Sequence, residues 1–211
     1  MARNYIHTLF TDAMRAWQTA DGSRDAYARM EAGADGSPDL LTQREQGFIA
    51  ERDSFYIASV SEEGWPYVQH RGGPKGFLKV LGESQLGMAD FRGNRQHVST
   101  ANIAANPRVS LFLMDYANRR RLKILAHAKV VSRESDSELV CQLMPDGYKA
   151  APQRAYIFDV VGFDWNCPAH ITRRFTEDEI TPLLEPLVDE RDRLRAALQA
   201  AQQTGGQQNP K

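Results

Sequence analysis

Apolar and polar residues alternate through the middle of the chain. In the stretch RLKILAHA, Leu122, Ile124 and Ala126 fall on one side of an extended backbone, while Lys123 and His127 fall on the other. This period of two predicts a half-buried strand. The other stretches that we interpret as strands are SFYIASV, YVQHR, FLKVL, LGMAD, RVSLFLMDY and RAYIFDVVGFDW. Turn sequences such as SEEGWP separate them.

Helical patterns occur before and between these strands. Residues 5–30 carry apolar side chains at roughly helical spacing, which predicts one or two amphipathic helices. Thr42 and Glu45 form a capping box for a short helix that ends near Glu51. A further helix is expected in QHVSTANIAAN, where Pro107 helps to end it, and another in SDSELVCQLM.

The last part of the chain is also expected to be helical. Thr176 and Glu179 form a second capping box at its start. Pro182 and Pro186 follow, and we expect them to divide or kink the helical region. The final segment, TGGQQNPK, has the composition of a flexible tail.

Regular short strands with few helices predict an antiparallel barrel rather than βαβ units. The fold class is therefore mainly β (β+α), with flanking N- and C-terminal helices. The chain divides into an N-terminal helical extension (1–40), a barrel domain (41–175), a C-terminal helical region (176–203) and a tail (204–211).

Composition narrows the possible functions. The 211 residues carry a formal net charge of −1, so no global charge attracts the chain to nucleic acid or to an acidic membrane surface. The two cysteines form no C-x-x-C motif, and the N-terminus has no long apolar core. These features favour a cytoplasmic protein, with no nucleic-acid or membrane partner and no metal site.

Polar side chains gather where the predicted strands end. After the strand LGMAD comes FRGNRQ, which supplies two arginines in front of a helix. The guanidinium group matches phosphate oxygens, and a helix N-terminus adds backbone N–H donors. One interpretation of this stretch is an anion-binding loop, and the other is an ordinary solvated surface loop. The run NRRR is likewise either a hairpin tip or part of a site.

The order of these signals resembles the pyridoxamine 5′-phosphate oxidase-like family of FMN-binding split barrels. The stretches that carry the resemblance lie between about Phe48 and Val131 and are GWPYVQ, LGMADFRGNRQ, ANIAANPRVSLFLMDY and RRLKILAHAKVV. The sequence of these stretches is most similar to a branch described as predicted flavin-nucleotide-binding proteins. The resemblance implies FMN as cofactor and a homodimer with FMN sites at the subunit interface. For such a dimer, we hypothesise that the N-terminal segment 1–40 and the C-terminal helical region pack on the partner.

The resemblance assigns roles by position. Arg95 falls on the arginine that binds the FMN phosphate, while Gln96 stands where the oxidase has a lysine. We expect Arg92 or Lys75 to compensate for that change. The complete set of cofactor candidates is Gln69, His70, Arg71, Lys75, Asp90, Phe91, Arg92, Asn94, Arg95, Gln96, Ser99, Arg121, Lys123 and Trp165. His170 and Arg174 are candidates for substrate contacts.

Departures from the oxidase pattern affect the functional prediction. Asp90 and Phe91 replace a Thr-Asn pair, and Arg121 stands where a glutamine touches the flavin. Pyridoxamine phosphate oxidation is therefore not the leading hypothesis. We expect an FMN-dependent oxidoreductase with an unknown substrate and no assigned catalytic residue. The alternatives are a non-catalytic flavin carrier or sensor, and a split barrel that binds haem or the deazaflavin F420.

Overall fold

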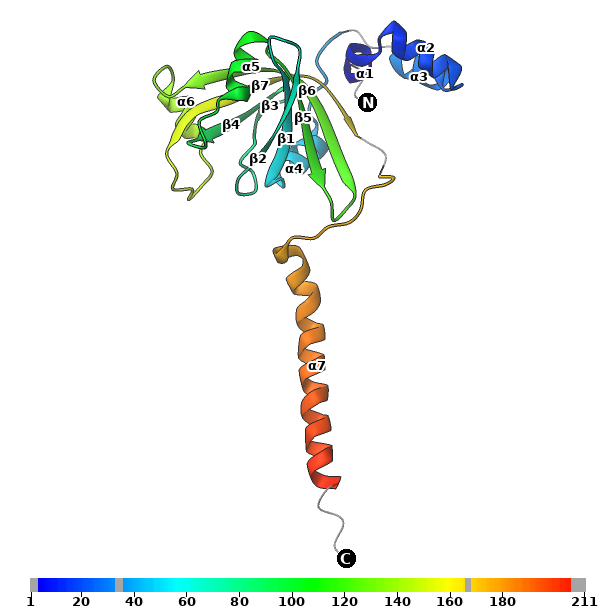
Figure 1. Ribbon diagram of the computed structural model, residues 1–211, viewed down its shortest axis with the longest axis vertical. Coiled ribbons are helices and arrows are strands. Elements are labelled where there is room, and N and C mark those ends of the chain that lie inside the picture. The colour runs from blue at the N-terminus through cyan, green and yellow to red at the C-terminus, as the bar shows by residue number, and fades with distance from the viewer. Residues whose placement is uncertain (1–3, 33–35, 166–167, 206–211) are drawn as a thin grey trace, which may run out of the picture.

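The computed structural model describes residues 4–32, 36–165 and 168–205. Its centre is one antiparallel sheet of seven strands in the order β2-β1-β5-β6-β7-β4-β3, which curls into a split barrel (Figure 1). The strands are β1 (Ser54–Val60), β2 (Pro66–Gly72), β3 (Lys79–Gly82), β4 (Gln85–Phe91), β5 (Arg108–Asp115), β6 (Arg120–Ser132) and β7 (Pro152–Trp165). The predicted antiparallel, mainly-β fold is confirmed.

Alternating burial along the strands builds the core. In β5, Leu111 and Leu113 are fully buried, and in β6 the same holds for Leu122 and Ile124. The residues between them are only half-buried, as the period-two pattern predicts. β7 pairs with both β6 and β4, so it links the two halves of the sheet.

Three short helices precede the barrel domain: α1 (Asn4–Leu9), α2 (Asp12–Ala20) and α3 (Arg24–Glu31). Helix α1 packs on β7, and α2 and α3 pack against each other beside it (Figure 1). The sequence pattern predicted one or two helices there, but Thr11 caps α2 and so separates it from α1. Contact with β7 is close, since a Cβ at Gly162 would lie 2.5 Å from the backbone nitrogen of Tyr5. The Asp39 carboxylate accepts hydrogen bonds from the backbone N–H groups of Asn4, Tyr5 and Phe163.

The helices within the barrel domain follow the sequence prediction. The capping box of Thr42 and Glu45 is present at the start of α4 (Gln43–Ala50). This helix buries Phe48 and Ile49 in the main core. The other two helices are α5 (Val98–Ala105), which precedes β5, and α6 (Ser137–Gln142), which precedes β7.

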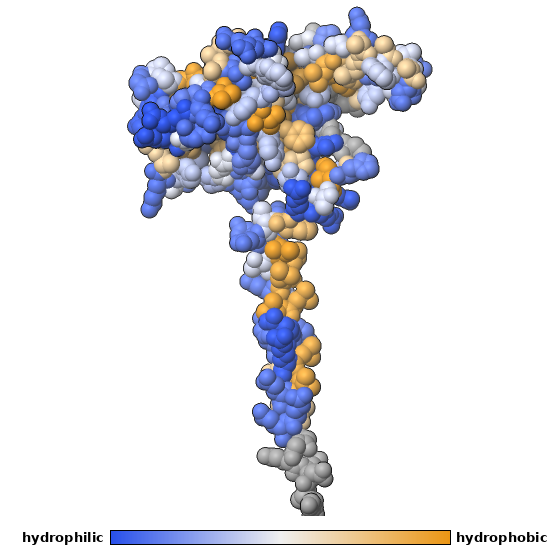
Figure 2. All heavy atoms as spheres, viewed as in Figure 1, coloured by the Kyte–Doolittle hydropathy of each residue, from blue (hydrophilic) through white to orange (hydrophobic). Residues whose placement is uncertain are grey.

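The last element, α7 (Glu177–Gly205), runs away from the barrel as one continuous helix (Figures 1 and 2). Of the two outcomes expected at Pro182 and Pro186, a division or a kink, the division is wrong. The carbonyls that lose their donors to proline belong to Asp178 and Pro182, which are exposed, so water can satisfy them. The expected tail began at residue 204, but the helix continues to Gly205. Residues 206–211 of that tail lie outside the described residues. Within the described part of the chain, no helix is long and apolar enough to cross a membrane.

Candidate functional site

A cleft of about 70 Å³ opens where β2, β4, β7 and the start of α5 meet. Its walls come from parts of the chain that are far apart in sequence. The lining residues are Gln69, Arg71, Asp90, Phe91, Gly93, Asn94, Arg95, His97, Ser99, Thr100, Gln153, Arg154 and Tyr156. The fold therefore brings together candidates from the GWPYVQHR and DFRGNRQ stretches.

Asp90 lies at the centre of the polar groups in this cleft. Its carboxylate accepts a hydrogen bond from Arg71 Nη1 at 2.7 Å, and Arg154 Nε lies 3.3 Å from the other carboxylate oxygen. Arg71 also donates to the hydroxyl of Tyr156 at 3.3 Å, and that hydroxyl is 2.6 Å from the hydroxyl of Thr100. The network thus joins side chains from three strands, β2, β4 and β7, and from one helix, α5.

The local charge is positive even after this pairing. Burial raises the pKa of Asp90 above the ordinary value of an aspartate, and the charges of Arg71 and Arg154 offset only part of that effect. One carboxylate stands among three arginines in the cleft lining, Arg71, Arg95 and Arg154. Such a surplus of guanidinium groups attracts an anion.

The loop after β4 has an unusual backbone. Arg95 and His97 adopt φ angles of 65° and 57°, in the left-handed region that residues other than glycine rarely occupy. Each such residue costs of order 1 kcal/mol and tends to occur at functional sites. The Asn94 side chain accepts a hydrogen bond from the backbone N–H of Gln96 at 3.2 Å, which closes the turn. Arg95 is exposed, and among the described residues it has no ion pair.

This loop places the start of α5 at the cleft. The N-cap residue is His97, and its side chain makes no capping hydrogen bond. The first N–H groups of the helix are therefore free for another acceptor. Besides the contact of Thr100 with Tyr156, two side-chain hydrogen bonds hold the helix in place: Ser99 donates to Gln69 Oε1 at 2.7 Å, and Asn102 donates to Ser59 Oγ at 3.0 Å.

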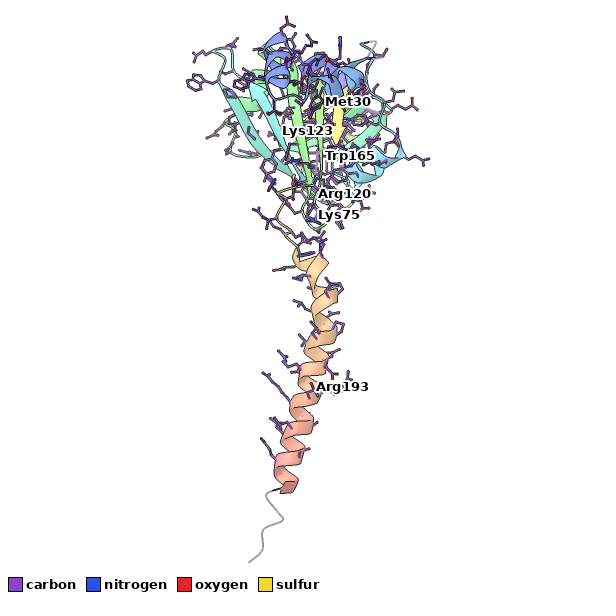
Figure 3. All side chains as sticks on the ribbon, turned by 90° about the vertical axis from the view of Figure 1, so that its right-hand side faces the viewer. Met30, Lys75, Arg120, Lys123, Trp165 and Arg193 are labelled. Atoms are coloured by element: carbon purple, nitrogen blue, oxygen red, sulfur yellow. The ribbon has the colours of Figure 1, made fainter. Side chains whose placement is uncertain are left out.

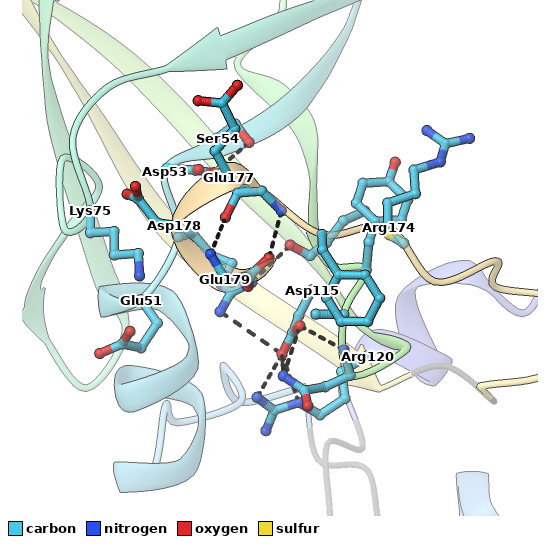
Figure 4. A pocket seen from close by; sticks show the side chains of 17 residues that line it. Glu51, Asp53, Ser54, Lys75, Asp115, Arg120, Arg174, Glu177, Asp178 and Glu179 are labelled. Carbon is cyan, nitrogen blue, oxygen red and sulfur yellow. Dashed lines mark hydrogen bonds and ion pairs between the residues drawn. The ribbon is translucent and has the colours of Figure 1, made fainter. Parts of the chain in front are cut away.

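Lys75 and Arg174 line a different cavity, of about 700 Å³, at the base of α7 (Figure 4). In this cavity Asp115 accepts hydrogen bonds from Arg120 at 2.7 and 3.1 Å and from Asn118. Arg174 lies over the ring of Tyr116, with 5.0 Å between its guanidinium carbon and the ring centroid. In one chain, neither Lys75 nor Arg174 reaches the Arg95 cleft.

Trp165 and Lys123 lie on another side of the barrel, near the N-terminal helices (Figure 3). The Trp165 indole N–H donates to Glu45 Oε1 at 2.6 Å, and the guanidinium of Arg44 lies 4.5 Å from its ring centroid. Lys123 pairs with Asp164 at 2.9 Å. Burial alone would lower the pKa of Lys123, but the contact with Asp164 raises it overall.

The remaining candidates are dispersed. His70 is exposed, with its ring centroid 5.5 Å from that of Tyr56. Arg92 and Gln96 are exposed on the loop after β4, and Arg92 lines a groove of about 960 Å³ that shares Arg95 with the cleft. His170 is exposed beyond β7.

Arg121 differs from the other candidates because its Nε is buried and has no hydrogen-bond partner among the described residues. Its guanidinium carbon lies 5.9 Å from the ring centroid of Phe112 on the neighbouring strand. A buried donor without an acceptor is costly, so this group is a candidate for contact with a ligand or a second chain.

Sequence reasoning missed Arg154 and Tyr156. Both lie in β7, more than 50 residues beyond the DFRGNRQ loop, and the pairing of Asp90 with Arg154 depends on the register between β4 and β7. The apolar run AYIF was a signal of a buried strand, and Ala155 to Phe158 are all buried. It could not indicate which strand would lie beside it.

The fold and the cleft together define a split-barrel protein with a donor-rich cleft beside an uncapped helix. Residues 41–163 match the family model described as Pyridoxamine 5′-phosphate oxidase. The chain belongs to this family. A search of curated protein sequences finds no match.

Solved structures with the same fold are distant in sequence. HupZ from Group A Streptococcus has a TM-score of 0.50 and 12% identity, with 64% of this chain and 100% of that chain covered. A Clostridium acetobutylicum protein related to general stress protein 26, of the pyridoxinephosphate oxidase family, has a TM-score of 0.45 and 16% identity, covering 65% and 94%. HutZ, a haem storage protein from Vibrio cholerae, has a TM-score of 0.39 and 20% identity, covering 59% and 94%. These likenesses concern the fold alone.

The residues of the cleft suit the chemistry of FMN. A phosphate monoester needs cationic and N–H donors, which the Arg95 loop and the free start of α5 supply. A flavin ring needs polar groups along its edge, and Gln69 and Arg71 offer them. The cleft volume of about 70 Å³ is well below the roughly 300–1,000 Å³ of usual ligand pockets. A group of this size would therefore extend beyond the cleft of one chain.

Proposed function

We propose that this protein is an FMN-binding flavoprotein that acts as an oxidoreductase on a substrate still to be identified. The observation that carries the proposal is the surplus of arginine around Asp90, next to the free N-terminus of α5, in a barrel of the pyridoxamine 5′-phosphate oxidase family. A cleft that attracts anions would be compatible with many ligands. Because the chain with this cleft also belongs to the pyridoxamine 5′-phosphate oxidase family, a phosphorylated flavin is favoured.

Arg95, Asn94 and the first N–H groups of α5 would hold the phosphate. Gln69 and Arg71 would orient the ring, and the positive charge of Arg71 would favour the anionic, reduced form of the cofactor. Flavin, when bound, supplies hydride and electron transfer. Asp90 lies between Arg71 and Arg154, where its negative charge offsets part of the positive charge of those two donors.

A homodimer would complete the site. The outer face of β1 and β2 exposes Tyr56, Val60 and Val68, by 38%, 36% and 62% respectively. The orphaned Nε of Arg121 and the shallow cleft are both consistent with a second chain that closes the site. In that arrangement, candidates that lie away from the cleft in one chain, such as Trp165, would act at the site of the partner.

The first experiment is an absorption spectrum of the purified protein, followed by mass identification of whatever heat releases. We expect a flavin spectrum and the mass of FMN. Reduction by NADH or NADPH, tested with several acceptors, then separates an oxidoreductase from a flavin carrier. A colourless protein that does not take up added FMN would overturn the proposal, and a released haem or F420 would replace it.

A further inference from the structure

A long exposed apolar surface lies along α7, where Figure 2 shows hydrophobic residues in a line. Leu187, Leu183, Leu194 and Leu198 are 66%, 62%, 61% and 59% exposed. A single helix in water gains little stability from its own hydrogen bonds, and contiguous apolar patches of this kind mark interaction surfaces. The surface therefore requires a partner.

The spacing of the apolar residues indicates what kind of partner this is. From Ile180 to Ala201 the residues that share one face follow steps of four and three: Ile180, Leu184, Leu187, Arg191, Leu194, Leu198 and Ala201. This is the a/d pattern of a coiled coil, sustained for three heptads. Pro182 and Pro186 fall on the opposite, outer positions f and c. The two prolines therefore do not obstruct the seam.

The charge of the helix argues against a membrane surface as the partner. Glu177–Gly205 contains seven acidic residues and only three basic ones. Helices that lie on anionic membranes carry the opposite charge, with lysine and arginine on the polar face. An acidic helix with a heptad seam is suited to another helix.

A second copy of the same helix provides complementary charge. In a parallel pair, Glu190 at position g of one copy faces Arg195 at position e of the other, so two attractive pairs flank the seam. Within one chain Glu190 pairs with Arg193 at 3.1 Å, but both side chains are exposed, so the exchange costs little. Arg191 at the seam lowers the stability of the pair and favours a single register.

We propose that the α7 helices of two copies of this chain form a parallel, two-stranded coiled coil, with Leu184, Leu187, Leu194 and Leu198 in its seam. Formation of this coiled coil does not depend on flavin binding in the barrel. Its two-fold axis runs along the helices and so brings two barrels side by side, which is compatible with a barrel dimer.

Cysteine cross-linking in the full-length protein tests the arrangement. In a Cys141→Ser, Cys167→Ser background, Leu194→Cys places a thiol at position d, and the matched control Ala196→Cys places one at the outer position f. With oxidised glutathione as oxidant, we expect Leu194→Cys to form a disulfide-linked dimer at least tenfold faster than Ala196→Cys, since only facing d positions approach within disulfide range. Equal rates, or no dimer from Leu194→Cys, would overturn the proposal.

A charge exchange tests the parallel register. In the Leu194→Cys protein, Glu190→Arg is expected to slow cross-linking severalfold, and adding Arg195→Glu should restore it. Asp189→Arg makes the same change of charge at the outer position f and should have no effect. If Asp189→Arg and Glu190→Arg slow the reaction equally, Glu190 does not flank the seam. Flavin content, measured on the same samples, reports separately on the proposed function.

Discussion

Two aspartates at the ends of separate strands, β4 and β5, are each held by arginines, yet their environments differ. Asp115, the last residue of β5, contacts Arg120 at 2.7 Å and Arg52 at 3.9 Å. Asp90, near the end of β4, contacts Arg71 at 2.7 Å and Arg154 at 3.3 Å. The pKa of Asp115 is lowered, whereas that of Asp90 is raised.

The donors around each carboxylate explain why the two pKa values shift in opposite directions. Burial alone would raise the pKa of Asp115, but hydrogen bonds from Arg120 and from the backbone and side chain of Asn118 outweigh it. Asn118 lies in the turn after Asp115, and Arg120 is the first residue of β6. The carboxylate therefore stabilises the β5–β6 hairpin to which it belongs. At Asp90 burial dominates, and both arginine partners come from other strands.

The charges around the two pairs differ as well. The cavity beside Asp115 is lined by four basic and six acidic residues, so it has no surplus of positive charge. The cleft around Asp90 has three arginines for one carboxylate. An arginine–aspartate pair is thus no indication of function by itself. The surplus charge around the pair separates a structural contact from a candidate anion site.

The largest expected effect is on stability, from Asp115→Asn. The variant removes a carboxylate whose side chain is 2% exposed and leaves Arg120 and Arg52 without their charged acceptor. We expect the free energy of unfolding at pH 7 to fall by about 2–3 kcal/mol, with flavin content unchanged. Urea denaturation measures this loss. Asp53→Asn, an exposed change in the same cavity, is the control and should stay within about 0.5 kcal/mol.

The pH dependence of this loss has a defined sign. Because the folded pKa of Asp115 is lowered, its contribution is fully present above the unfolded pKa of about 3.9. It disappears as the pH falls through the folded value. The stability difference between wild type and Asp115→Asn should therefore vanish in acid, and a difference that persists there would point to packing rather than charge.

The next effect is on the ligand, from Arg95→Ala. Arg95 is exposed and unpaired among the described residues, so its loss should leave the free energy of unfolding nearly unchanged. Loss of a charged hydrogen bond to phosphate costs about 1.5–3 kcal/mol, so we expect the Kd for FMN to rise about 10- to 100-fold. Fluorescence titration of the apoprotein measures it. Arg133→Ala, in the adjoining groove, is the control. Unchanged affinity in Arg95→Ala would remove Arg95 from the site.

Sequence alone could predict the parts of the fold and site that depend on local pattern. Alternation within strands such as β6 and the capping box at Thr42 are short-range signals, and the structure confirms them. The loop with Arg95 was recognisable because an apolar strand ends directly before it. Arg154 was not, because its position beside Asp90 depends on strand pairing across more than 60 residues. The continuity of α7 through two prolines was missed for a related reason, since water on an exposed face replaces their lost donors.

The smallest expected effect, and the sharpest contrast with Asp115, comes from Asp90→Asn. Because the folded pKa of Asp90 is raised, its contribution to stability is present below the unfolded pKa of about 3.9 and is lost as the pH rises through the folded value. At pH 7 the charged native carboxylate is thus a net cost, and an amide still accepts from Arg71. We expect a change in unfolding free energy below about 1 kcal/mol, more favourable to the variant at pH 7 than at pH 4. This pH trend is opposite in sign to that at Asp115.

Removing the negative charge of Asp90 should also tighten FMN binding. We expect a severalfold effect at low salt and a smaller one at high salt, because salt screens the field of the remaining arginines. If Asp90→Asn destabilises the fold as much as Asp115→Asn and weakens FMN binding, both aspartates are structural and the surplus charge around Asp90 has no role in binding.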